Sequence, residues 1–190
     1  MATGSSGSRR SRRPRSRPRI SVLRVGHRLG RYPRLTTHLA LAARALGAER
    51  MFLHPPDPKL AARLAAVGRG WGGKFEVVGV DDWKSVVRSS PGLVVHLTMY
   101  GRPLDGLTPR LRRSRDVLLV VGGAKVPSDL FRVADLNVAV GHQPHSEVAA
   151  LAIVLDRLLG TPGPGRWPGA RRAVVPRARG KKVAMRAEHT

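Results

Sequence analysis

Three glycine-containing segments each follow a short apolar run that is typical of a buried strand. They are His96–Gly101 (HLTMYG), Gly122–Pro127 (GGAKVP) and Val140–Glu147 (VGHQPHSE). If the preceding strands are parallel neighbours, all three segments lie at one edge of the sheet, where glycines let the backbone approach a ligand closely. Backbone N–H and C=O groups there could recognise an adenine and a ribose. One such loop is more often an ordinary turn, but three together favour a nucleoside pocket.

A cluster of basic residues lies between the first predicted strand and the helix after it. Its members are Arg24, His27, Arg28, Arg31 and Arg34, and Thr36, Thr37 and His38 come directly after them. Cations at the amino end of a helix are unfavourable unless an anion meets them, because the helix dipole is positive there. The cluster therefore predicts a phosphate-binding surface, and a solvated basic loop is the alternative interpretation.

Other motifs give weaker signals. His142 and His145 have a spacing that a metal pair could use, but Pro144 lies between them and no third ligand is obvious, so we expect no metal site. Lys125 could contact a phosphate or a carboxylate, or be a solvated loop lysine. Trp71-Gly-Gly73 is more often a packed turn than a surface for base stacking. The chain has no Walker A sequence and no GxGxxG motif after a strand, which argues against a P-loop NTPase or an ordinary Rossmann dehydrogenase.

Positive charge is the strongest global signal. The 190 residues include 35 Lys and Arg against 12 Asp and Glu, for a formal net charge of +23, and 29 of the cations are Arg. Arg grips phosphate bidentately and stacks on bases, so we expect a nucleic acid partner. The absence of cysteine excludes disulfides and thiolate chemistry. No apolar run is long enough to span a bilayer and no signal-peptide pattern is present, so we expect no membrane association and a cytoplasmic location.

From Ile20 onward, short apolar runs alternate with helix-like stretches. We expect strands at Ile20–Val25, Arg50–Leu53, Phe75–Val80, Leu93–Leu97, Val117–Val121 and Leu136–Val140. We expect helices at Leu35–Leu46, Lys59–Val67, Asp82–Ser89, Asp105–Arg113, Val126–Val133 and Ser146–Leu159. Thr36 and Thr37 provide cap signals for the first helix, and Ser146 caps the last, which Gly160 ends. This alternation predicts an α/β fold with a parallel sheet.

The two ends of the chain differ from the part between them. Residues 1–19 contain seven Arg and no acid, a composition that predicts a disordered basic arm. Residues 20–160 form the predicted domain. Residues 161–190 are rich in Pro, Gly and Arg and predict a basic tail that docks on this domain.

Several segments resemble one family in sequence and order. They are LRVGHR (23–28), RLTTHLALAARALGA (34–48), WGG (71–73), VHLTMYG (95–101), VGGAKVP (121–127), GHQPHSEVAALAIVLDRLLG (141–160) and VPRARGKK (175–182). On these segments the chain resembles the archaeal tRNA ribose 2′-O-methyltransferases that act on cytidine 56 of the T-loop, which belong to the SPOUT class. HLTMYG and QPHSEVAAL are the most specific of the matches.

The resemblance implies a SPOUT fold, in which a parallel sheet flanked by helices ends in a C-terminal trefoil knot. It also implies a homodimer that acts on tRNA with S-adenosyl-L-methionine as cofactor. Carried over position by position, the cofactor-binding residues are Leu97, Gly122, Gly123, Ala124, Lys125, Val126, Val140, Gly141, His142, Gln143, Pro144, His145, Ser146 and Glu147.

The chain departs from the family pattern at three places. Ala124 stands where the family usually has an acidic residue, and His142 stands where it often has Asn. Arg31-Tyr-Pro-Arg34 lacks the acid that commonly follows the first Arg. The backbone contacts of these loops tolerate the changes, whereas the acidic side chain that the family has at position 124 has no counterpart in this chain.

The implied reaction is in-line methyl transfer from a sulfonium to a ribose 2′-hydroxyl. We expect Arg34 and Arg28 to hold the adjacent phosphate and stabilise negative charge on the oxygen, with His27 or His38 as proton acceptor. Two rival interpretations are a SPOUT methyltransferase of another RNA site and a non-enzymatic basic RNA-binding protein.

Overall fold

A six-stranded parallel sheet forms the centre of the computed structural model, which describes residues 17–27, 33–123, 126–163 and 167–185. Its strands are β1 (Arg19–Val25), β2 (Arg50–His54), β3 (Glu76–Gly79), β4 (Leu93–Pro103), β5 (Asp116–Val121) and β6 (Leu136–Ala139). They lie in the order β3-β2-β1-β5-β4-β6, and each neighbouring pair is parallel. The six predicted strands and the parallel α/β architecture are therefore confirmed.

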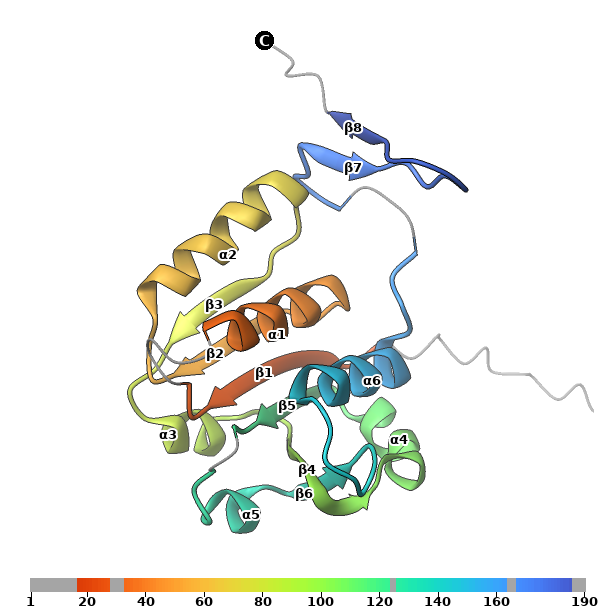
Figure 1. Ribbon diagram of the computed structural model, residues 1–190. Coiled ribbons are helices and arrows are strands. Elements are labelled where there is room, and N and C mark those ends of the chain that lie inside the picture. Colours follow the sequence, from red (N-terminus) through yellow and green to blue (C-terminus); the bar gives the residue numbers. More distant parts are fainter. Residues whose placement is uncertain (1–16, 28–32, 124–125, 164–166, 186–190) are drawn as a thin grey trace, which may run out of the picture.

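Helices cover both faces of this sheet (Figure 1). They are α1 (Pro33–Ala45), α2 (Pro58–Trp71), α3 (Trp83–Arg88), α4 (Leu104–Arg113), α5 (Leu130–Val133) and α6 (Glu147–Leu159). Apolar residues of α1, α2, α4 and α6 pack on one face, and those of α3 and α5 pack on the other. Alternate residues of β5 enter the two cores: Val117 and Leu119 the first, Leu118 and Val120 the second.

The cap signals of α6 are confirmed and those at the start of α1 are not, while α5 begins four residues later and α2 ends four residues later than predicted. Ser146 caps α6, accepting from the Val148 amide at 3.2 Å, and Gly160 ends it with φ +71°. The helix α1 instead begins at Pro33, so Thr36 and Thr37 lie inside its first turns and the cap prediction for them is wrong. Proline is favoured at a first helical position because its missing N–H would have no partner there.

The C-terminal residues contribute a small hairpin that the sequence pattern does not predict. Strands β7 (Arg172–Val174) and β8 (Val183–Met185) pair antiparallel. The segment before them docks on the C-terminal end of α2, where the Gly73 amide donates to the Pro168 carbonyl at 2.8 Å. Gly72 has φ +75°, and a Cβ there would lie 2.7 Å from backbone atoms of residues 168 and 170. The two glycines of the WGG motif thus form a packed turn, as favoured from the sequence.

Two sequence predictions concern features beyond these elements. The proposed disordered arm, residues 1–19, lies almost entirely outside the described residues. In the described part of the chain, no helix is both long and apolar enough to cross a membrane.

Candidate cofactor-binding and catalytic site

A cavity of about 440 Å³ lies where β5 and β6 end and where the pairing of β4 with β5 stops at Leu97. Its lining residues are His96, Leu97, Thr98, Met99, Tyr100, Gly122, Gly123, Val126, Phe131, Val138, Val140, Pro144, His145, Ser146, Glu147 and Ala150. Because these three strands are parallel neighbours, the expectation that the three glycine-containing segments meet at one edge is confirmed. This is the edge at which open α/β sheets bind ligands.

The first of those segments is not a loop, contrary to the prediction. Strand β4 continues through it to Pro103, with a shift of register against β6 between Leu97 and Arg102. Gly101 makes the continuation possible, because a Cβ there would lie 2.4 Å from the Val138 nitrogen and 2.6 Å from the Asn137 carbonyl oxygen. The irregular strand turns Thr98, Met99 and Tyr100 toward the cavity.

Nine of the fourteen predicted cofactor-binding residues line this cavity. They are Leu97, Gly122, Gly123, Val126, Val140, Pro144, His145, Ser146 and Glu147. Gly141, His142 and Gln143 are not among its lining residues, and Ala124 and Lys125 lie outside the described part of the chain. His142 instead donates from Nε2 to the Gly101 carbonyl at 3.2 Å, which ties the third segment to β4.

Sequence reasoning missed three lining residues, Phe131, Val138 and Ala150. Strand alternation could have indicated Val138, which pairs with Leu97 in the β4–β6 register. Phe131 and Ala150 come from helices, and the side of a helix that borders a cavity depends on how it packs on the sheet. These residues are therefore identified only by the tertiary structure.

A buried ion pair ties one wall of the cavity to β1. Arg24 is 4% exposed, and its Nη1 lies 2.9 Å from Glu147 Oε2 and donates to the Gly122 carbonyl at 2.7 Å. Burial removes Arg24 from the predicted phosphate-binding surface, so that part of the prediction is wrong. Its position on β1 decides this, because Arg24 lies on the sheet face that α6 covers, where Glu147 meets it.

His27 is also buried, and both of its ring nitrogens are occupied. Nε2 donates to Asp57 Oδ2 at 3.1 Å, and Nδ1 lies 3.0 Å from Thr36 Oγ1. The Leu60 amide, which donates to Asp57, and His27 itself hold the pKa of Asp57 below its usual value. His27 therefore joins β1, α1 and the start of α2, and it is not part of an exposed phosphate-binding surface as predicted.

Of the other predicted members of the basic cluster, some lie on α1 and others lie outside the described residues. Arg34 and His38 are exposed on α1, close to the end of β1. Arg28 and Arg31 lie outside the described residues. The exposed part of the cluster is thus smaller than the sequence predicted.

His96 is the titratable group most deeply buried in the cavity wall. Its Nδ1 lies 2.9 Å from Asn137 Oδ1, and its ring packs edge-on against Phe131 with centroids 4.7 Å apart. Burial lowers the pKa of His96 because the imidazolium would lose its hydration. The neutral imidazole gives this wall a polar but uncharged surface.

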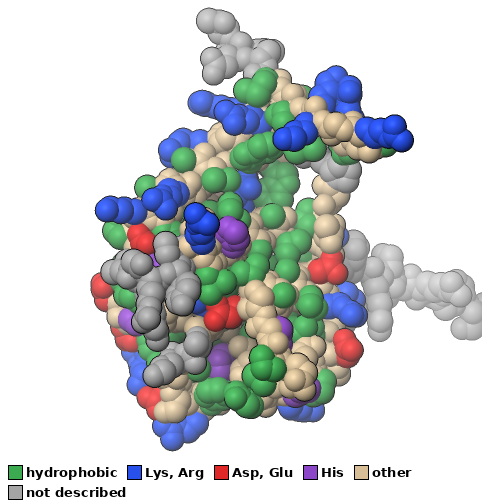
Figure 2. All heavy atoms as spheres, in the orientation of Figure 1, with side chains coloured by type: hydrophobic (Ala, Val, Ile, Leu, Met, Phe, Trp, Pro, Cys, Tyr) green, Lys and Arg blue, Asp and Glu red, His purple; other side chains and the backbone are tan. Residues whose placement is uncertain are grey.

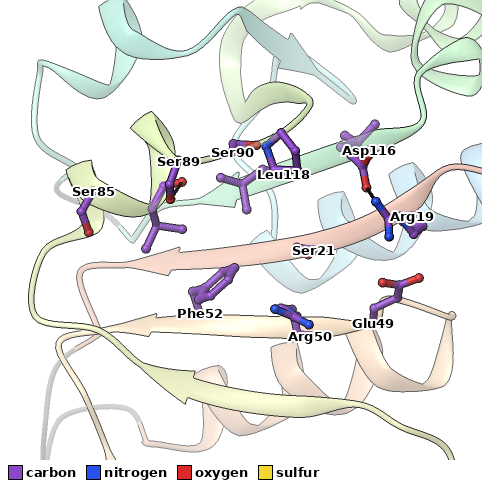
Figure 3. A pocket seen from close by; sticks show the side chains of 13 residues that line it. Arg19, Ser21, Glu49, Arg50, Phe52, Ser85, Ser89, Ser90, Asp116 and Leu118 are labelled. Atoms are coloured by element: carbon purple, nitrogen blue, oxygen red, sulfur yellow. Dashed lines mark hydrogen bonds and ion pairs between the residues drawn. The ribbon is translucent and has the colours of Figure 1, made fainter.

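A second cavity, of about 390 Å³, lies at the opposite, amino-terminal ends of the strands (Figure 3). Phe52 and Leu118 form its apolar part, and Arg19 on its rim is paired with Asp116 at 2.6 Å. None of the predicted site residues lines it. Because it opens at these ends, it does not lie where ligands of such sheets bind.

Among the described residues there is no group of three His, Cys, Asp or Glu side chains that could hold a metal ion.

The first cavity has the combination of apolar and polar lining groups that S-adenosylmethionine requires. Apolar side chains of β4, β6 and α5 surround the space, and Gly122 and Gly123 leave backbone groups accessible at its edge. Glu147 Oε2 is buried without a hydrogen bond of good geometry among the described residues, although Arg24 is close to it. Apolar walls with a few polar groups are typical of a site for a nucleoside and its charged extension.

The sequence model of the Trm56 family, described as tRNA ribose 2′-O-methyltransferase, matches residues 71–184. The chain belongs to this family. It is 49% identical over 168 residues to the tRNA (cytidine(56)-2′-O)-methyltransferase of Cenarchaeum symbiosum, covering 87% of this chain and 96% of that protein. It is 46% identical over 175 residues to the protein of the same name from Thermococcus kodakarensis, covering 88% and 97%.

Solved structures of SpoU methyltransferases share the fold of this Trm56 family member. AviRb from Streptomyces viridochromogenes, solved with the cofactor AdoMet, superposes with a TM-score of 0.57 at 16% identity. That match covers 77% of this chain and 58% of AviRb, so the chain spans under two thirds of that structure's length. The TrmH/SpoU tRNA modifying enzyme of A. aeolicus gives a TM-score of 0.55 at 12% identity, covering 75% and 76%. At these identities the likeness shows a SpoU-like α/β fold.

Proposed function

We propose that this protein methylates the ribose 2′-hydroxyl of cytidine 56 in the T-loop of tRNA, with S-adenosylmethionine as the methyl donor. One observation carries the proposal: described residues of the three segments that match the family, HLTMYG, VGGAKVP and GHQPHSE, line one cavity at the carboxyl edge of the parallel sheet. Relatives that are 42–49% identical over most of their length carry the name of this activity.

When bound, S-adenosylmethionine supplies a methyl group that its sulfonium already activates for transfer. The remaining work for the protein is to position the 2′-oxygen and to ease the loss of its proton. We assign the cofactor to the cavity, against the backbone of Gly122 and Gly123 and beside Glu147. Because position 124 carries no acid in this chain, we assign the polar contacts of the cofactor to those backbone groups and to Glu147.

Arg34 and Arg28 are the residues that we assign to the substrate. Arg34 is exposed on the first turn of α1, at the same edge of the sheet as the cavity, where its guanidinium can bind a phosphate beside the reacting ribose. A cationic fork there also stabilises negative charge that develops on the 2′-oxygen.

His27 could accept the substrate proton only through an intervening group, because both of its ring nitrogens already have partners. Nε2 donates to Asp57, so in a neutral ring the lone pair is on Nδ1, which faces the Thr36 hydroxyl. A proton from the substrate would reach it through that hydroxyl. His38, exposed on the same helix, is the alternative acceptor.

We also propose the trefoil knot that the family resemblance implies. The chain leaves β6 at the edge of the sheet and returns to α6, which packs against α1 and α4. The returning segment passes the end of β4, where His142 bonds to Gly101. A crystal structure in which α6 is threaded through the preceding loop would test this proposal directly.

A homodimer is the assembly that we propose. Tyr100 is 78% exposed although it borders the cavity, and Ile153 is exposed on α6, so both present apolar surface that a second subunit could cover. Light scattering should give twice the mass of the chain, and a monomeric mass would contradict this.

We propose a cytoplasmic location because the substrate is tRNA.

The decisive experiment is to map the methylated nucleotide on an unmodified tRNA transcript. We expect one ribose methyl group, at cytidine 56, and no product from a transcript with a 2′-deoxycytidine at that position. Methylation of another nucleotide would indicate a different RNA target. Absence of transfer, together with no thermal stabilisation by S-adenosylmethionine, would indicate a non-enzymatic RNA-binding protein.

A further inference from the structure

The C-terminal hairpin adjoins the end of α2 through backbone hydrogen bonds such as that from the Arg171 amide to the Gly70 carbonyl. We call the exposed cations of α2, of the hairpin and of the residues between them and the neighbouring strands the basic track. Its members are Lys59, Arg63, Arg69, Lys74, Arg171, Arg172, Arg177, Arg179, Lys181 and Lys182, all exposed. Residues 58–75 and 167–185, which contain the track, include no Asp or Glu. Figure 2 shows Lys and Arg side chains along α2 and over the hairpin beyond its end.

Cations on the opposite face of the sheet have acidic partners, whereas the cations of the basic track do not. On the opposite face of the sheet, Arg19, Lys84 and Arg88 each pair with an aspartate. Among the described residues, no member of the track forms an ion pair or a side-chain hydrogen bond. Ten uncompensated cations on one surface repel one another, so this surface is adapted to a polyanion.

A small cavity of about 290 Å³ lies where the hairpin meets α1 and α2. Trp71, Trp167 and Arg172 line it, together with Arg44, which is 8% exposed. The Arg44 guanidinium donates to the Gly72 carbonyl and lies 5.4 Å from the centre of the Trp167 ring, but its Nε has no hydrogen-bond partner among the described residues. Aromatic rings and an arginine without an acid nearby are the groups on which proteins stack unpaired bases.

The track leads from the catalytic edge of the sheet to its opposite edge. Lys59 lies beside Asp57, which contacts His27, whereas the hairpin is attached at the other end of α2. The 14 residues of α2 span about 21 Å at 1.5 Å per residue. An RNA that follows the track from the reacting nucleotide must therefore extend well beyond one loop.

We propose that the basic track is a second RNA-binding surface, which holds the tRNA backbone outside the methylated loop, and that the cavity between α2 and the hairpin receives one unstacked base. This inference rests on the proposed function, because it takes tRNA as the substrate. It adds a contact surface that is remote from the cofactor cavity.

Two variants with equal loss of charge test the track. The tip variant carries four substitutions at the tip of the hairpin: Arg177→Gln, Arg179→Gln, Lys181→Gln and Lys182→Gln. The control variant carries four substitutions at exposed positions outside the track: Arg88→Gln, Arg110→Gln, Arg113→Gln and Arg115→Gln. Binding of full-length tRNA transcript is measured over a range of salt concentrations. We expect the tip variant to bind about 10- to 100-fold more weakly with a salt dependence reduced by about 2–4 in slope. The control should bind within about threefold of the unaltered protein, a margin that corresponds to less than one such contact.

Equal weakening by both variants would overturn the proposal, because it would show that only total charge matters. The outcome is independent of the proposed function: failure of the unaltered protein to methylate tRNA counts against the activity, whereas the comparison of the two variants concerns binding alone. For an active protein, kcat at saturating tRNA should be unchanged in the tip variant, while KM rises.

Tryptophan fluorescence tests the base-binding cavity. The chain has three Trp, and Trp83→Phe leaves only Trp71 and Trp167, both at this cavity. We expect saturating tRNA to quench their emission, and the quenching to persist with a transcript that lacks the T-loop nucleotides. Unchanged fluorescence at saturation would exclude base stacking in the cavity.

Discussion

Arg24 Nη1 on β1 and Glu147 Oε2 at the start of α6 lie 2.9 Å apart. The pair lies near the carboxyl ends of the strands, and Glu147 lines the cofactor cavity. The same guanidinium donates to the Gly122 carbonyl at the end of β5. One buried side chain thus links three elements that are distant in sequence. Glu147 also lies in the first turn of α6, where a carboxylate is favoured by the helix dipole.

Replacing Glu147 with Gln should lower the free energy of unfolding by about 3 kcal/mol, because the buried charge of Arg24 loses its partner. Urea unfolding measures the change. The matched control is Glu76→Gln, which breaks the exposed pair with Arg50 and should cost about 0–1 kcal/mol. Equal costs for the two variants would show that the buried pair contributes no more than a surface pair.

Gly101→Ala should destabilise the protein by about 1–3 kcal/mol, because the new Cβ would overlap the backbone of β6, which cannot move aside cheaply. Gly106→Ala, in α4 with no atom within 4 Å of the added Cβ, is the control and should be neutral or stabilising by up to about 1 kcal/mol. Thermal unfolding with and without S-adenosylmethionine would also show whether the distorted β4 weakens cofactor binding. Unfolding at the same temperature for both variants would contradict the close approach at Gly101.

Stability should fall as the pH decreases through the range below about 6.5, partly because of His96. Burial lowers its pKa in the folded state, so the unfolded chain binds the proton first and is favoured as pH falls from the unfolded value through the folded one. Urea unfolding at two pH values, on either side of this range, measures the loss. His96→Gln should reduce the loss, whereas His38→Gln, at an exposed position on α1, should leave it unchanged. A loss of the same size in all three proteins would exclude His96 as its source.

Arg34→Ala should reduce kcat for methyl transfer by about 100-fold or more, because a charge-stabilising donor would be lost. Binding of S-adenosylmethionine, measured by calorimetry, should remain near normal, since Arg34 is not among the residues that line the cavity. Arg110→Ala, an exposed cation on α4 outside the basic track, should retain kcat and serves as the control. Parallel loss of transfer and of cofactor binding would contradict the assignment of Arg34 to the substrate.

The sequence by itself determined the strands, most of the helices and the edge at which the site lies. Apolar runs such as Val117–Val121 are long enough and regular enough to predict a strand without knowledge of its neighbours, and parallel packing then places their following segments together. The family motifs added the cofactor and the reaction, because their residue types and order are specific. Ser146 and Gly160 were identified as helix ends for the same local reason.

Only the tertiary structure decided which basic residues are exposed and which are buried. Arg24, His27 and Arg34 look alike in sequence as members of one basic cluster, yet Arg24 pairs with Glu147, His27 bonds to Asp57, and Arg34 remains exposed. The partners lie 30 to 123 positions away along the chain, so no local pattern could indicate them. The continuation of β4 past Leu97 and the docking of the hairpin on α2 likewise depend on contacts between distant segments, where the packing of neighbouring backbones sets the conformation.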